Sequence, residues 1–188
     1  MLTIQKGSPM KKVLFIFGEL NDFDADWISA TGQKEIVPAG NLLIQEGKPV
    51  GALYIVLDGA FSVTVAALGN KEIARVGAGE IMGEMSFIEA RPPSATVKAV
   101  ERSIVLAIPR VQLSAKLKQD TAFAARFYRA LAVFLSYRLR KTVSHLGYGK
   151  VADETEEPAS LDELDPNVLD KLHLAGARFD RMVKRLIS

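Results

Sequence analysis

Residues 83–97 carry the side chains of this chain that are best suited to hold an anionic ligand. Gly83 lets the backbone approach a ligand closely and adopt a positive φ angle. The N–H groups from there to Phe87 can form an anion site without a cationic side chain, as helix starts and backbone nests do. Glu84 stands before the apolar Met85 in a turn that we expect to be half-buried, so its carboxylate needs partners. The stretch therefore predicts a pocket of phosphate size with a carboxylate beside it.

The order of residues in this stretch resembles the phosphate-binding cassette of cyclic nucleotide-binding domains. The positions that fit the family pattern are Gly83, Glu84, Ser86, Phe87, Ser94, Ala95, Thr96 and Val97. In that family the glutamate accepts a hydrogen bond from the ribose 2′-OH, and an arginine pairs with the cyclic phosphate. Pro93 stands where the family has this arginine, which removes a charge-assisted hydrogen bond worth about 1.5–3 kcal/mol. Arg91 is the nearby cation, and the sequence leaves open whether its side chain turns inward or stays outside.

The resemblance implies a site for cyclic AMP, cyclic GMP or a related anionic ligand. The predicted ligand-binding residues are Gly83, Glu84, Met85, Ser86, Ser94, Ala95 and Arg91. We predict no catalytic residue, metal ligand or cofactor. His145 and His173 both fall in helical segments outside the predicted strands, and no Ser-His-Asp or paired-carboxylate arrangement is recognisable. An enzyme is therefore the least favoured class.

Short apolar runs separated by glycine-containing turns fill the middle of the chain. They predict strands at 35–37, 42–44, 53–57, 61–65, 72–76, 96–100 and 103–108. This spacing predicts a mainly β fold, an antiparallel β-roll of jelly-roll type with flanking helices. The order of the parts also resembles the cyclic nucleotide-binding domain, over roughly residues 13–146.

Helices are predicted on both sides of the strands. A short one spans 21–29, with Asn21 or Asp22 as N-cap. Its apolar residues on one face are Phe23, Trp27 and Ile28. The longer one, over 122–146, carries apolar residues at a spacing of four. They are Phe123, Phe127, Leu131, Leu135, Leu139 and Val143, widened by Phe134 and Tyr137.

This apolar stripe is wider than docking on one small barrel requires, so we expect a homodimer through the long helix. The alternative is that the whole stripe packs on the protein's own barrel. The opposite face carries only cations among its charged residues. They are Arg126, Arg129, Arg138, Arg140 and Lys141, which together predict a local positive field.

The chain divides into three predicted segments: a cyclic nucleotide-binding-like domain over 1–146, a linker over 147–165 and an amphipathic helix over 166–188. The linker is acidic, with no Lys or Arg from 151 to 165, so we expect it to stay solvated. Asp165 and Pro166 suit the N-cap and first position of the last helix. This helix can dock on its own domain, on a partner or on an anionic membrane surface, and we favour its own domain or a dimer contact over the membrane.

Composition limits the function classes further. The chain has 188 residues, a net charge of +2 and no cysteine, and we find no membrane span, so we expect a soluble, cytoplasmic protein. The tail is too short for a winged helix-turn-helix and its acidic run repels phosphates, which disfavours nucleic acid and a transcription regulator. We expect a non-enzymatic sensory or regulatory module that binds a cyclic nucleotide and acts on an unidentified protein partner. A degenerate cassette that works as a ligand-independent protein-interaction module is the alternative.

Overall fold

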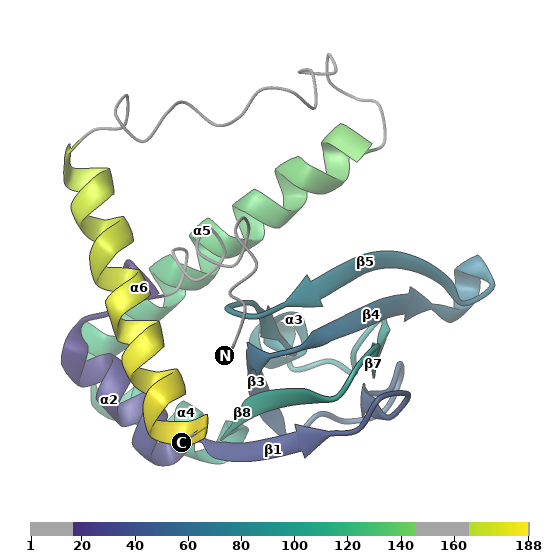
Figure 1. The fold of residues 1–188 in the computed structure, drawn as a ribbon, viewed down its shortest axis with the longest axis horizontal. Helices are drawn as coiled ribbons and strands as arrows, with labels where there is room; N and C mark the ends of the chain where they lie inside the picture. Colours follow the sequence, from purple (N-terminus) through teal and green to yellow (C-terminus); the bar gives the residue numbers. More distant parts are fainter. Residues whose placement is uncertain (1–16, 146–165, 188) are drawn as a thin grey trace, which may run out of the picture.

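Two antiparallel sheets form the centre of the molecule in the computed structural model, which describes residues 17–145 and 166–187 (Figure 1). The first sheet has the strand order β1 (Gln33–Val37), β8 (Ser103–Pro109), β3 (Ala52–Asp58) and β6 (Ile81–Met82). The second has the order β2 (Leu42–Ile44), β7 (Thr96–Ala99), β4 (Ala60–Val65) and β5 (Lys71–Gly77). The predicted antiparallel β-roll with flanking helices is thereby confirmed. The predicted linker lies outside the described residues.

Five helices and one 3-10 turn surround the sheets in the described part of the chain. They are α2 (Asp22–Thr31), η1 (Ala66–Leu68), α3 (Glu84–Glu89), α4 (Arg110–Gln119), α5 (Thr121–His145) and α6 (Pro166–Ile187). Asn21 caps α2, because its side chain accepts from the Asp24 N–H while the Asp24 carboxylate accepts from the Asn21 N–H, each at 2.9 Å. Asp120 separates α4 from α5, and its carboxylate accepts the Phe123 N–H at 2.8 Å. None of the described helices is long and apolar enough to cross a bilayer.

Strand β8 is buried on both faces, which explains the unbroken apolar run from Ile104 to Ile108. Leu106 and its neighbours two residues away contribute to a core between the first sheet and the helices. Val105 faces the other way and packs with Phe61 and Val97 in a second core between the two sheets. The strand that joins both cores thus fixes the sheets and helices relative to each other.

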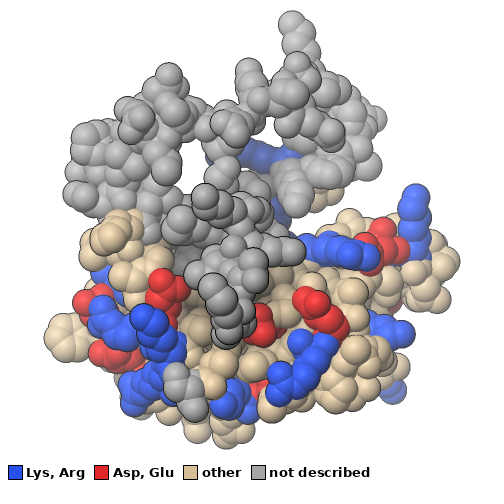
Figure 2. Space-filling view, in the orientation of Figure 1, with Lys and Arg blue, Asp and Glu red and all other residues tan. Residues whose placement is uncertain are grey.

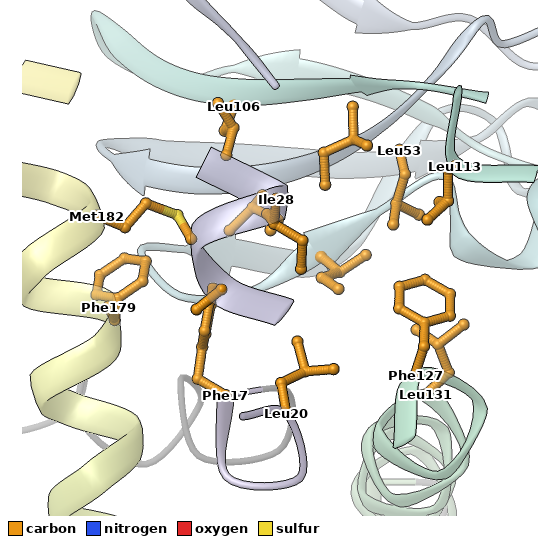
Figure 3. Packing of buried hydrophobic residues seen from close by; sticks show 14 of the residues in the cluster. Phe17, Leu20, Ile28, Leu53, Leu106, Leu113, Phe127, Leu131, Phe179 and Met182 are labelled. Carbon is orange, nitrogen blue, oxygen red and sulfur yellow. The ribbon is translucent and has the colours of Figure 1, made fainter. Parts of the chain in front are cut away.

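The last helix packs on the N-terminal part of its own domain. Phe179 and Met182 of α6 lie in the same core as Phe17 and Ile28 (Figure 3), and the rings of Phe17 and Phe179 are 5.8 Å apart. Arg178 donates hydrogen bonds to the Phe17 carbonyl at 2.8 Å and to the Asp22 carboxylate at 2.6 Å. The sequence left open three surfaces on which this helix could dock. In the structure it docks on its own domain.

The expectation that α2 presents Phe23 on the same face as Ile28 is wrong. Ile28 is buried, whereas the Phe23 side chain is 84% exposed. Five residues at 100° each place these two side chains about 140° apart around the helix axis. Only one of them can therefore face the core.

Candidate functional site

The predicted site begins at Gly83, which caps the short helix α3. Strand β6 pairs with β3 just before it, with Met82 opposite Tyr54, so the start of α3 is held against the first sheet. Gly83 has a φ of +85°, and a Cβ atom there would lie 3.2 Å from the Ala52 carbonyl oxygen. The backbone angle and this close approach therefore both favour glycine at position 83.

Glu84, the first residue of α3, forms a buried ion pair with a residue from the long helix. Its side chain is 3% exposed, and its Oε1 atom lies 2.5 Å from Nη1 of Arg138 on α5. The Arg138 guanidinium also lies over the Phe134 ring, 5.1 Å from its centre. Burial raises the pKa of the Glu84 carboxyl, and the charge of Arg138 offsets this rise only in part. The helix that lies over the cassette thus contacts the residue predicted to hold the ribose.

The other predicted site residues divide into buried and exposed ones. Ser86 is buried, and its hydroxyl donates a hydrogen bond to the carbonyl oxygen of Arg91. Ala95 is half-buried and packs on the core between the sheets. Met85 is 49% exposed, and the side chains of Ser94 and Arg91 are also exposed. No ion pair of Arg91 is found among the described residues, so its guanidinium faces solvent in this structure.

The loop that contains Pro93 is fixed through its backbone. The Pro93 carbonyl oxygen accepts the N–H of Gly47 at 2.9 Å, which ties the loop to the turn after β2. Close by, the Thr96 hydroxyl accepts the N–H of Glu46 at 3.1 Å. Because these contacts use main-chain atoms and a neighbouring hydroxyl, the loop keeps its position without an arginine at 93.

Arg110 is a contact that sequence reasoning missed. Its guanidinium donates to the carbonyls of Ser86 at 3.0 Å and Val50 at 3.3 Å, and lies 5.5 Å from the centre of the Phe87 ring. The bond to Ser86 satisfies a carbonyl group near the end of the short helix α3, and the bond to Val50 holds the segment before β3. Arg110 therefore links the cassette helix α3 to the start of α4 and to the segment before β3.

The cationic face predicted for α5 is largely paired with acidic residues from other elements. Arg126 makes two hydrogen bonds to the buried Asp24 at 2.6 and 2.9 Å. Arg129 pairs with Glu19 at 2.9 Å, and Arg138 pairs with the cassette as described above. Acidic and basic side chains are also interspersed on the α2 and α6 side of the face seen in Figure 2. The expected positive field is thus reduced, because residues remote in sequence supply the opposite charges.

These features define a class of domain: a β-roll with a short cassette helix, α3, that is contacted by the long helix α5 after the roll. Residues 34–120 match the family model described as "Cyclic nucleotide-binding domain". The chain belongs to this family, as its residues 83–97 predicted.

Individual relatives agree with this assignment. The cyclic AMP receptor protein of Thermus thermophilus is 31% identical over 138 residues, which are 72% of this chain and 59% of that protein. The cAMP-dependent protein kinase regulatory subunit of Blastocladiella emersonii is 31% identical over 153 residues, covering 79% of this chain and 37% of the relative. Among solved structures, a cyclic nucleotide-binding domain from Methylobacillus flagellatus superimposes with a TM-score of 0.65 at 22% identity, covering 80% of this chain and 91% of that one. The chain thus spans less than two thirds of either sequence relative.

Proposed function

We propose that this chain is a non-enzymatic, cytoplasmic regulatory module that binds a cyclic nucleotide, or a related anionic ligand, in the 83–97 cassette. The observation that carries the proposal is the buried Glu84 carboxylate at the start of α3, next to Gly83, whose positive φ angle favours glycine. The names of the two sequence relatives, a cyclic AMP receptor and a cAMP-dependent kinase regulatory subunit, support cyclic AMP as the first ligand to test.

The Glu84–Arg138 pair does not use every acceptor position of the Glu84 carboxylate. Arg138 bonds Oε1, and a carboxylate has about four acceptor positions on its two oxygens. One of the positions that Arg138 leaves unused is the one that we propose for a ribose hydroxyl. Arg91 of the 90–95 loop, exposed and without an ion pair among the described residues, is the cation that would have to turn inward to meet the phosphate.

A ligand-independent interaction module is the second candidate, and specific observations favour it. Pro93 supplies no cation, the Arg91 side chain points into solvent, and Glu84 already has an ionic partner in the structure without any ligand. In that case the cassette fixes α5 on the roll, and the protein acts through its surface alone.

Calorimetric titration with a panel of cyclic mononucleotides separates the two candidates. Under the first, cyclic AMP or cyclic GMP at micromolar concentration gives saturable heat, and Glu84→Ala weakens binding at least about tenfold. Glu89→Ala, at the exposed end of the same helix, serves as the matched control and leaves binding unchanged. A panel without heat of binding contradicts the first candidate and leaves the interaction module.

We further propose that the module acts as a homodimer through α5. The inner face of this helix is used by the core, with Phe123, Phe127 and Phe134 fully buried. Its outer side still exposes large apolar side chains. They are Tyr128, Leu139 and Val143, of which Leu139 is 64% exposed, whereas the exposed Val133 lies about 140° around the helix axis from Tyr128. Because the roll does not cover this outer side, a second copy related by twofold symmetry is the partner that we propose for it.

A further inference from the structure

A shallow groove lies between α2 and α4, apart from the cassette. From α2 it is lined by Trp27, Ala30 and Thr31, and from α4 by residues of one face, including Ala115 and Gln119. A second hollow continues from the first across Ala115 and Gln119, along the outer face of α4. The small alanines leave volumes of about 450 and 480 Å³ in the two hollows. The continuous depression follows α4, which has 10 residues and a length of about 15 Å.

The charges that line this groove are all positive. Arg110, Lys116 and Lys118 are its ionisable residues, and neither hollow is lined by a carboxylate. Lys116 lies over the Trp27 ring, 5.8 Å from its centre, and pairs with Asp120 at 2.8 Å. Lys118 is exposed, and no ion pair of it is found among the described residues. The groove is therefore electrostatically complementary to an acidic partner.

Large apolar side chains accompany these cations. Val111, at the start of α4, is 82% exposed and lines the second hollow. Phe23, the most exposed large apolar residue of α2, lies one helical turn before Trp27 and so on the same side of that helix. A helix-in-groove contact uses apolar anchors of this kind, and cations beside them would favour a helix with acidic flanks.

We propose that the α2–α4 groove binds an amphipathic acidic helix of a partner protein. Its apolar stripe would lie over Ala30 and Ala115, between Phe23 and Val111, with acidic side chains toward Lys118. A small molecule is the poorer fit, because such ligands are held in sites that enclose most of their surface, whereas both hollows are open. The proposal does not depend on a nucleotide in the cassette.

The single tryptophan of the chain makes the test direct, because Trp27 lines the groove. The probes are two synthetic helical peptides of roughly 15 residues, about four turns, both without tryptophan. They share one stripe of leucines and differ only in flanks of glutamate or of lysine. We expect the glutamate peptide to change the Trp27 emission saturably, and the lysine peptide to bind at least about tenfold more weakly.

Two variants localise the contact. Lys118→Glu should weaken binding of the glutamate peptide about tenfold or more, while Lys71→Glu, the same charge change on the exposed strand β5, should not. Equal binding of the two peptides, equal loss from both variants, or no change in emission would overturn the proposal. A change in the Trp27 emission on adding duplex DNA in place of the peptide would also overturn it. So would a Trp27 emission that changes with protein concentration in the absence of peptide, because a second copy of the chain would then occupy the groove. The peptide comparison on the unaltered chain decides the matter even if a variant folds poorly.

Discussion

The guanidinium of Arg138 contacts the carboxylate of Glu84 across 54 residues of sequence and joins the long helix α5 to the cassette at α3. Further along α5, the large apolar side chains Leu139 and Val143 are exposed. The pair therefore connects the predicted ligand site to the turns of α5 that we propose to form a dimer. A ligand that bonds to Glu84 would act directly on this pair.

The burial of Glu84 makes the free energy of unfolding depend on pH. Burial raises the pKa of Glu84 above its ordinary value of 4.5, so the folded state holds this proton more tightly than the unfolded state. The stability that Glu84 contributes should therefore decrease as the pH rises from 4.5 through the raised pKa. Urea unfolding of the wild type and Glu84→Gln across this range measures it: the advantage of the wild type should shrink with rising pH. A growing advantage would show that Arg138 outweighs burial.

Pro93→Arg should create or tighten cyclic nucleotide binding. The substitution restores the charged partner of the phosphate, and the Pro93 carbonyl bond to Gly47 uses a main-chain atom that every residue has. A charge-assisted hydrogen bond of about 1.5–3 kcal/mol corresponds to a gain of about ten- to a hundredfold in affinity by calorimetry. Pro92→Arg places the same charge one residue earlier and is the control. Equal affinities of the two variants would mean that position 93 does not face the ligand.

Asp24→Asn should destabilise the fold without any ligand. Asp24 is 3% exposed and holds Arg126 of α5 through two hydrogen bonds while it also completes the cap of α2. Loss of the charged acceptor should cost about 1.5–3 kcal/mol in the free energy of unfolding. Asp26→Asn changes an exposed residue of the same helix and should leave the urea midpoint nearly unchanged. Similar midpoints for both variants would contradict the structural role of Asp24.

Leu139→Asp should convert the proposed dimer to a monomer. The Leu139 side chain is 64% exposed in the single chain, so the change disturbs little within the domain but places a charge in the proposed interface. Light scattering at low micromolar concentration gives the masses. Ile73→Asp on β5, where the side chain is 51% exposed, is the matched control and should remain dimeric. A wild type with the mass of one chain would refute the dimer itself.

The strands and the cassette were predictable because their signals are local. Short apolar runs and glycine turns predicted the seven longer strands, and only the two-residue β6 was missed. Gly83 and Glu84 were found through residues within one short stretch of sequence. The N-cap of α2 was likewise specified by the chemistry of Asn21 and the acid three residues later.

The partners of the cassette were not predictable, because they depend on how elements pack. Glu84 needed a partner and Arg138 stood on a helix face without acids, yet only the fold brings these two residues together. The same holds for Arg110, whose acceptors are carbonyl groups that have no signature in sequence. The prediction for Phe23 was wrong for another reason. Its apolar character did not decide which side of α2 faces the core.

The contact between α6 and the N-terminal part of the domain bears on the order in which the protein folds. Arg178 reaches the carbonyl of Phe17 across 161 residues, so this part of the core closes only after nearly the whole domain has been synthesised. Before α6 is made, Phe179 and Met182 cannot cover the apolar side chains of Phe17 and Ile28, with which they share a core. A nascent chain of this protein that ends before α6 should therefore be a client for chaperones, even when its β-roll is already formed.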